Sequence, residues 1–264
     1  MVKRLFCIAV CLITVLASAC GGDTPKESFV LDDTLKQAVA AYNELNTLSL
    51  AFAFDMKKQG AEESLLFTQG TVSYKNDSAL ALSGRVTQVK NGKGVTSDIF
   101  YKAGAYYSDN GTGKYYLIMD KDEMLKTFFC VDVPLPDEAL INGFRKAQTS
   151  GGTKYVYTAE KANALYMFET NLYGYSGLRK PVRDKTDFSA AEYSYVVDDK
   201  GQLKSFKIST TVTLYDTAPY YPNYTVPQSE LMHSFNISLE LTVKASGNAV
   251  VVETPNTKDY VFLG

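Results

Sequence analysis

The feature that most constrains this fold is a strict alternation of apolar and polar side chains in long segments. From Phe235 to Val243 every second residue is apolar, and the same pattern runs from Leu48 to Met56. Successive side chains of a β-strand point to opposite faces, so each segment is predicted to be a strand with one apolar face. A sheet of such strands needs a second layer to cover that face.

Further segments have strand-like alternation or a composition that favours strands, and turn residues separate them. These predicted strands span residues 65–74, 80–86, 97–101, 105–108, 114–119, 154–157, 192–197, 203–214 and 249–253. Asn110-Gly111 is typical of a tight hairpin turn. Gly84 indicates a bulge or a close approach between strands.

Four segments instead favour helices, at residues 31–45, 120–129, 134–147 and 158–173. In the first, apolar side chains recur three or four residues apart, which gives one apolar stripe. Asp120 and Glu123 have the spacing of a capping box. Residues 174–189 and the Tyr- and Pro-rich residues 217–228 are predicted to be loops, either of which is a candidate contact surface.

The N-terminal segment resembles a bacterial lipoprotein signal peptide. Lys3 and Arg4 precede an apolar run over residues 5–16, and Ala17-Ser18-Ala19 places small residues directly before Cys20. The resemblance implies that residues 1–19 are removed and that the thiol of Cys20 receives a diacylglyceryl group. Residues 20–30 would then be a flexible tether, and the protein would lie on the extracytoplasmic face of a cell membrane.

Two alternatives compete with lipidation of Cys20. A transmembrane helix needs about 20 apolar residues, more than the segment 5–19 provides. Ordinary secretion is compatible with the same small residues, and cleavage after Ala19 would leave an unmodified thiol at the N-terminus. Removing residues 1–19 takes away two basic residues and no acidic one, so the formal charge changes from −2 to −4. This charge provides no electrostatic footprint for nucleic acid.

Catalytic and metal-binding chemistry finds little support. His233 is the only histidine, and no nucleophile-elbow or phosphate-binding motif occurs. Cys130 lies in an apolar context that favours a buried, inert thiol. Asp120 to Glu123 lacks the glycine and the distal glutamate of a calcium loop. We therefore expect no enzyme activity, no metal and no cofactor, although a carboxylate pair assembled in space remains an alternative.

The order of elements predicts an α+β fold that is mainly antiparallel. About ten strands and few helices favour a strongly curved sheet, a half-barrel, wrapped around two to four helices. Here the chain resembles the LolA/LppX-like superfamily of bacterial envelope proteins. The resemblance covers residues 31–264 as a single domain and rests on the opening helix, the meander strands, the mid-chain helices and the terminal strand.

This resemblance implies a lipid or another amphipathic ligand bound between the curved sheet and the helices, and no catalytic residues. The candidate lining residues are those of the predicted mid-chain helices: Phe128, Phe129, Leu140, Phe144, Leu165 and Phe168. The alternative at each position is that the side chain only fills the core. The alternative function is a non-catalytic envelope sensor or interaction protein with a packed core and a protein partner. Its contact surface would be residues 217–228 or the basic cluster at 179–185.

Overall fold

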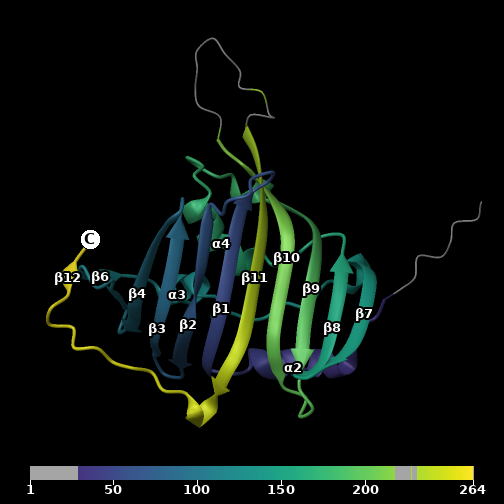
Figure 1. Ribbon diagram of the computed structural model, residues 1–264, viewed down its shortest axis with the longest axis horizontal. Coiled ribbons are helices and arrows are strands. Elements are labelled where there is room, and N and C mark those ends of the chain that lie inside the picture. The colour runs from purple at the N-terminus through teal and green to yellow at the C-terminus, as the bar shows by residue number, and fades with distance from the viewer. Residues whose placement is uncertain (1–28, 218–226, 228–230, 264) are drawn as a thin grey trace, which may run out of the picture.

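A single large sheet dominates the computed structural model, which describes residues 29–217, 227 and 231–263 (Figure 1). In this part of the chain twelve strands are hydrogen-bonded in the order β12-β6-β5-β4-β3-β2-β1-β11-β10-β9-β8-β7. Their bounds are β1 Thr47–Lys58, β2 Leu66–Asn76, β3 Leu80–Lys90, β4 Lys93–Lys102, β5 Ala105–Asp109, β6 Lys114–Ile118, β7 Ile141–Thr149, β8 Gly152–Ala159, β9 Asp187–Val197, β10 Leu203–Tyr215, β11 Met232–Ser246 and β12 Val261–Phe262. Only β12 pairs in parallel, with β6. The predicted signal peptide, Cys20 and most of the tether and of the 217–228 loop lie outside the described residues.

The alternation at the centre of the sheet lines up its apolar side chains. β1 pairs with β11, and Phe52 and Phe54 lie opposite Leu241 and Leu239. These four side chains are buried, while Asp55, the residue after Phe54, lies on the other face. The predicted strands at 48–56 and 235–243 are therefore confirmed.

Two glycines let neighbouring strands approach closely. A side chain at Gly84 of β3 would place its Cβ 2.5 Å from the carbonyl oxygen of Thr71, and one at Gly70 of β2 would collide with the carbonyl of Arg85. No larger residue fits either position without moving the backbone. The close approach predicted at Gly84 is confirmed.

Three α-helices occur in the described part of the chain: α2 Asp33–Asn43, α3 Lys121–Thr127 and α4 Leu165–Tyr175. α2 lies across one end of the sheet against β9 and β10, while α3 and α4 contact each other on the concave face (Figure 1). Asp32 caps α2 and Asp120 caps α3 through side-chain bonds to backbone N–H groups. The prediction of a curved antiparallel sheet wrapped around two to four helices is confirmed.

The helix predicted at 134–147 is wrong. Glu138–Leu140 forms one 3₁₀ turn, and Ile141–Thr149 is the edge strand β7, which pairs with β8. Most side chains of β7 are exposed, so the strand has no apolar alternation for a sequence pattern to reveal. The apolar spacing in this segment instead resembled one helical face, and the backbone hydrogen bonds available from β8 outweighed it.

Two predicted boundaries differ in the structure, and one predicted strand is absent. α4 begins at Leu165, because Thr158 and Ala159 continue β8 instead of starting a helix. β9 begins at Asp187, inside the predicted loop 174–189. The strand predicted at 249–253 is absent from this described stretch: Gly247–Ala249 is a 3₁₀ turn, and the backbone N–H of Glu253 bonds to the Ser83 hydroxyl instead of to a strand.

Candidate ligand-binding site

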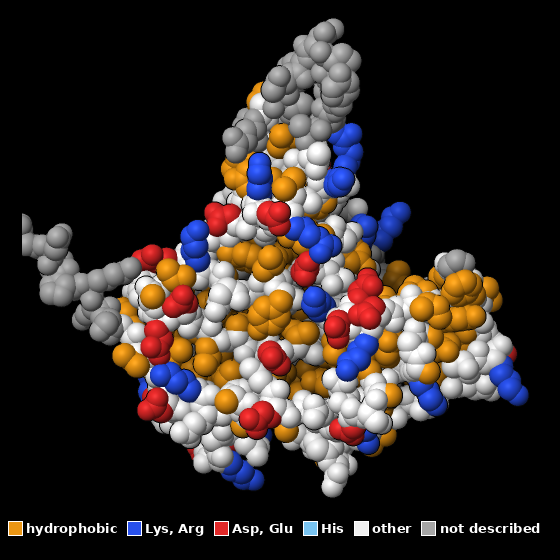
Figure 2. All heavy atoms as spheres, turned by 180° about the vertical axis from the view of Figure 1, so that it is seen from behind, with side chains coloured by type: hydrophobic (Ala, Val, Ile, Leu, Met, Phe, Trp, Pro, Cys, Tyr) orange, Lys and Arg blue, Asp and Glu red, His pale blue; other side chains and the backbone are white. Residues whose placement is uncertain are grey.

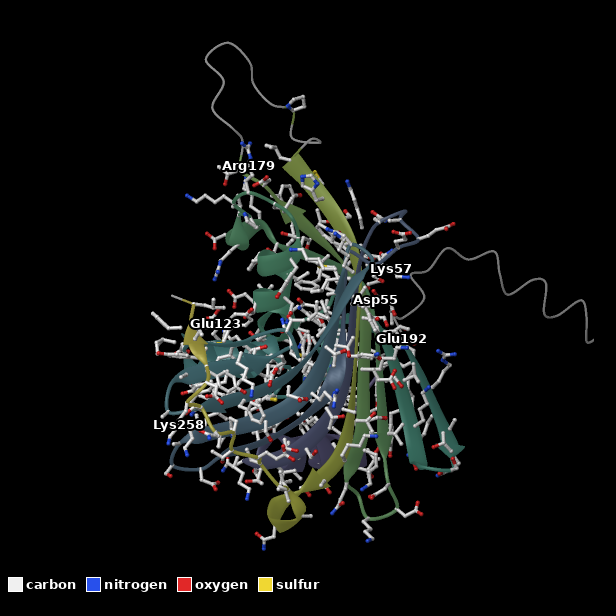
Figure 3. The ribbon with its side chains drawn as sticks, turned by 60° about the vertical axis from the view of Figure 1, so that its left-hand side comes forward. Asp55, Lys57, Glu123, Arg179, Glu192 and Lys258 are labelled. Atoms are coloured by element: carbon white, nitrogen blue, oxygen red, sulfur yellow. The ribbon has the colours of Figure 1, made fainter. Side chains whose placement is uncertain are left out.

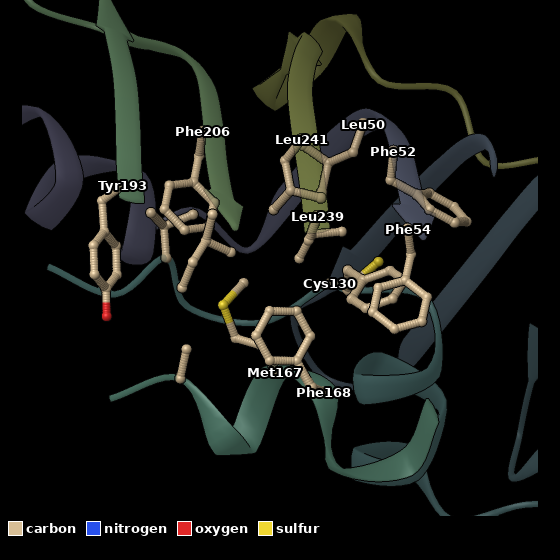
Figure 4. Close-up of a cluster of buried hydrophobic side chains, with 14 of the residues drawn as sticks. Leu50, Phe52, Phe54, Cys130, Met167, Phe168, Tyr193, Phe206, Leu239 and Leu241 are labelled. Carbon is tan, nitrogen blue, oxygen red and sulfur yellow. The ribbon is translucent and has the colours of Figure 1, made fainter. Parts of the chain in front are cut away.

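Phenylalanine rings fill the interface between the helices and the concave face of the sheet. Phe54 of β1 lies 5.2 Å from Phe129 and 6.0 Å from Phe168 of α4, measured between ring centroids (Figure 4). Phe52 lies 5.5 Å from Phe129. We call this set the aromatic layer, which comprises Phe52, Phe54, Phe128, Phe129, Phe168 and Phe188. The centroid distances are those of favourable aromatic pairs.

Phe129 has an unusual backbone conformation at the end of α3. The N–H of Cys130 bonds to the carbonyl of Leu125 and the N–H of Phe129 to that of Lys126, which is the hydrogen-bond pattern of a Schellman motif. That motif places the residue at position 129 in the left-handed region, with φ of 57°. Glycine normally occupies this position, because a side chain there costs about 1–2 kcal/mol. The chain instead keeps a fully buried Phe, so the ring and the backbone conformation make opposing contributions to stability.

The structure brings together three of the six predicted lining residues. Phe128, Phe129 and Phe168 belong to the aromatic layer and are buried. Leu140 and Leu165 are half-buried at its margin. Their binding of a ligand stays a prediction.

Phe144 does not belong to this interface. It lies on β7 instead of a helix, is 37% exposed, and stacks on Tyr157 with 4.6 Å between ring centroids. This placement follows from the wrong helix assignment at 134–147, and it leaves Phe144 as a side chain of the edge strand.

A pocket of about 320 Å³ lies beside the aromatic layer, between the end of α2, the end of β2 and the segment that follows α3. We call it the tyrosine pocket. Its buried lining includes Tyr42, Tyr74 and Cys130, and its exposed lining includes Asn46 and Asp132. Its volume is at the lower end of the range typical of ligand sites, about 300–1,000 Å³.

Two residues that line the tyrosine pocket each have a buried polar atom without a hydrogen-bond partner in the described part of the chain: the hydroxyl of Tyr42 and the Oδ1 atom of Asn76. Burial raises the pKa of Tyr42 well above its usual value, and the nearby Tyr74, Cys130 and Asp132 raise that pKa further. Burial likewise raises the pKa of Cys130, so this thiol stays protonated as predicted for an inert cysteine.

The segment between α3 and β7 is fixed in place by side-chain hydrogen bonds. Asn43 of α2 accepts from the N–H of Val133 at 2.8 Å and donates to its carbonyl at 3.1 Å. Tyr195 of β9 donates to the carbonyl of Pro134, and Tyr166 of α4 to that of Asp132. The walls of the tyrosine pocket are therefore held by three separate elements.

A second hollow, of about 790 Å³, is lined by residues of both α3 and α4 and has a charged lining. Glu169 pairs there with Arg183 at 2.6 Å and with Lys126 at 3.5 Å. Asp120 accepts from the N–H groups of Asp122 and Glu123, so the capping interpretation of this acidic segment is confirmed. Within the described ranges no group of His, Cys, Asp and Glu residues is arranged to hold a metal ion.

Other polar side chains and the single histidine of the sequence, His233, lie apart from the aromatic layer. Asp55, Lys57 and Glu192 lie on the outer face of the sheet, whereas Glu123 lies on the helix side (Figure 3). His233 is a strand residue of β11 opposite Leu214. Seen from the helix side, apolar patches alternate with acidic and basic side chains (Figure 2).

The basic cluster at 179–185 is held against other parts of the chain. The backbone N–H groups of Arg179 and Lys180 bond to the Asp216 carboxylate, and the Arg183 guanidinium pairs with Glu169. Among the residues that the structure describes, no helix has the length and apolar composition that a membrane span requires.

No protein-family model and no curated protein sequence matches this chain. Among solved structures it is similar to LprF from Mycobacterium bovis, with 12% identity and a TM-score of 0.44 over 84% of this chain and 95% of that one. It is also similar to a LolA superfamily protein from Nitrosomonas europaea, with 7% identity and a TM-score of 0.30 over 84% of this chain and 96% of that one. A third similar structure is a putative outer membrane lipoprotein-sorting protein domain from Vibrio parahaemolyticus. It has 11% sequence identity and a TM-score of 0.23, over 84% of this chain and 93% of that one.

The order of elements in the half-barrel agrees with the order expected from the sequence. An opening helix, a meander of strands, mid-chain helices on the concave face and long terminal strands follow one another as the resemblance implied. Two departures from the expected order are the edge strand β7, which extends the sheet where a helix was expected, and the absence of the strand expected at 249–253.

Tyr42 and Asn76 are the site residues that sequence reasoning missed. The helical pattern assigned Tyr42 to the apolar stripe of α2 and did not treat its hydroxyl as a separate group. A tyrosine in an apolar stripe is a usable signal, because a buried hydroxyl usually has a partner. Nothing in the sequence indicates that Asn76, more than thirty residues later, reaches the same pocket.

Proposed function

We propose that this protein is a lipid-anchored extracytoplasmic protein that binds the acyl chain of an amphipathic ligand between the sheet and the helices α3 and α4. The observation that carries the proposal is the aromatic layer. It is a continuous set of apolar rings where two layers of the fold meet, and it is contributed by sheet and helices together. An acyl chain inserted there would replace ring–ring contacts with ring–methylene contacts of similar character.

The end of α3 is the element best suited to move when a ligand enters. α3 has seven residues, and the unfavourable backbone conformation of Phe129 reduces the stability of the closed arrangement. Rotation of this short helix would carry Phe128 and Phe129 away from Phe52 and Phe54 and open a path over the sheet. The segment from Val133 onward, held by Asn43, would act as the fixed end of this movement.

The lipid anchor would keep the domain close to its ligand. A tether of eleven residues spans at most about 40 Å when fully extended, so the half-barrel would stay near the surface of the membrane that holds Cys20. Acyl chains are abundant there, and a binding protein in solution would meet them more rarely.

Native mass spectrometry of the protein purified from its own membrane tests this function. We expect a population that carries one co-purified lipid, and uptake of added fatty acyl ligand by the remainder. As a matched pair, Phe54→Ala at the layer should weaken uptake, whereas Phe206→Ala, a buried ring of β10 outside the layer, should not. A ligand-free mass that stays unchanged after incubation with lipids contradicts the proposal.

The second candidate function is a non-catalytic envelope interaction protein with a protein partner. The close packing of Phe128, Phe129 and Phe168 in the core favours it, because fully buried rings need no ligand to satisfy them. In that case lipid uptake is absent, and chemical cross-linking in intact cells identifies a protein bound to the domain.

A further inference from the structure

The tyrosine pocket has the properties of a site for a polar group rather than of a packing defect. Its volume of about 320 Å³ is roughly ten times the share of one water molecule in the liquid, about 30 Å³. Tyr42 is 5% exposed, and its hydroxyl has no partner in the described part of the chain. Buried polar groups are nearly always hydrogen-bonded, so this hydroxyl requires a partner that the chain itself does not supply.

The two unpartnered atoms restrict the chemistry of that partner. Asn76 Oδ1 only accepts hydrogen bonds, so the partner must carry a donor. The Tyr42 hydroxyl both donates and accepts. An ionised phosphate or carboxylate has no proton to donate to Asn76, and an ammonium group cannot accept the proton of Tyr42. A hydroxyl group satisfies both atoms.

The charge of the lining agrees with this restriction. Asp132 is the only carboxylate among the described residues that line the pocket, and no Lys or Arg of these residues lines it. An anionic group would lose solvation on entry without gaining a positive partner. The pocket therefore favours an uncharged ligand.

The pocket and the aromatic layer share one structural element. Leu125 and Cys130 line the tyrosine pocket, while Phe128 and Phe129, between them in sequence, project into the aromatic layer. A displacement of this segment would join the two spaces, because residues 125–130 form a wall of each. A ligand with a polar end and an apolar end would then occupy both.

We propose that the tyrosine pocket binds the uncharged, hydroxyl-bearing glyceryl head group of an acylglycerol, whose acyl chain lies in the aromatic layer. This inference rests on the proposed function, since the aromatic layer must admit the tail. The Tyr42 hydroxyl donates to one head-group oxygen, and a head-group hydroxyl donates to Asn76 Oδ1. The head group thereby supplies the partners that these two buried atoms lack.

The test is a competition between three lipids with the same oleoyl tail. The full-length protein is incubated with an equimolar mixture of monooleoylglycerol, oleoyl lysophosphatidic acid and methyl oleate, and bound species are identified by native mass spectrometry. We expect the monooleoylglycerol adduct to exceed each of the others by about fivefold or more, the effect of roughly one hydrogen bond. Free glycerol, added alone at the same concentration, should leave no adduct because it lacks the tail.

The variant Tyr42→Phe removes only the hydroxyl. It should weaken monooleoylglycerol binding by about fivefold to tenfold and leave methyl oleate binding unchanged. Without ligand the same variant should unfold at the same or a higher temperature, because no protein partner is lost. Tyr101→Phe is the matched control: its buried hydroxyl donates to the carbonyl of Met119, away from the pocket, so it should lower the unfolding temperature without changing lipid selectivity.

The outcomes separate the two proposals. Equal adducts of all three lipids, or unchanged selectivity in Tyr42→Phe, overturn the head-group site and leave acyl-chain binding intact. A structure of the lipid-bound protein in which only water fills the tyrosine pocket also overturns the head-group site. Absence of any adduct with all three lipids overturns both the proposed function and this inference.

Discussion

The backbone at Phe129 allows a sharp test, because it should reverse the usual order of stability between alanine and glycine variants. Both Phe129→Ala and Phe129→Gly remove a fully buried ring from the aromatic layer. Only the glycine variant also relieves the left-handed conformation, with φ of 57°, that the Schellman motif imposes. The two variants therefore share the cost of the lost ring and differ in the backbone.

The magnitudes follow from these two contributions. Loss of a buried Phe side chain costs about 3–5 kcal/mol of unfolding free energy. The left-handed region costs alanine about 1–2 kcal/mol more than glycine. The unfolded chain of the glycine variant is more flexible, which offsets about 0.4–1 kcal/mol of this advantage. Phe129→Gly should therefore be more stable than Phe129→Ala by about 0.8 kcal/mol, the middle of the range that these two contributions allow, although both are less stable than the wild type.

Phe168 is the matched control, because it is equally buried but lies in the helix α4. There the glycine variant should be less stable than the alanine variant by about 1 kcal/mol. Equilibrium urea unfolding measures all four variants, and tyrosine fluorescence is a suitable signal in a chain with 19 Tyr and no Trp. If Phe129→Ala is as stable as Phe129→Gly or more so, the argument about backbone strain at the end of α3 is refuted.

Three further predictions concern the anchor, the fixed segment and the response to acid. Cys20→Ala should move the protein from the membrane fraction to the soluble fraction, and retention in membranes would contradict the anchor. Asn43→Ala removes both hydrogen bonds to the backbone of the buried Val133 and should lower the unfolding free energy by about 2 kcal/mol. An unchanged urea midpoint would show that these two hydrogen bonds contribute nothing to stability. The hydrogen bond from Lys146 lowers the pKa of Asp32 below its ordinary value of 3.8, so its stabilisation is present above that value and is lost as pH falls through the lower folded value. Asp32→Asn should accordingly flatten the dependence of the urea midpoint on pH between about 5 and 3, and an unchanged slope would contradict this assignment.

The parts of the fold that could be predicted are those in which burial of one face requires a periodic pattern of apolar residues in the sequence. β1 and β11 have one face in the core, so their sequences alternate and their register follows from that alternation. α2 has a capping Asp32 and an apolar stripe, and α3 has a capping Asp120, so both helices were identified from sequence alone.

β7 illustrates what local sequence does not determine. Its side chains are mostly exposed on both faces, and its strand conformation depends on hydrogen bonds to β8. Such pairing is a tertiary contribution that outweighs local spacing. The candidate site was predictable to a similar extent: the apolar helix residues Phe128, Phe129 and Phe168 were identified. The meeting of Tyr42 with Asn76 depends on the path of the whole sheet.

The two side edges of the half-barrel differ in how they are protected from other molecules. β12 covers part of β6: Val261 and Phe262 pair with Tyr115 and Tyr116, while Ile118 beside them stays 70% exposed. At the opposite edge β7 has Arg145 and Lys146 and a register shift between Ile141 and Gly143, features that discourage strand addition. Self-association through the sheet should therefore begin at β6, and detachment of the short C-terminal strand would expose an edge at which half-barrels can add to one another.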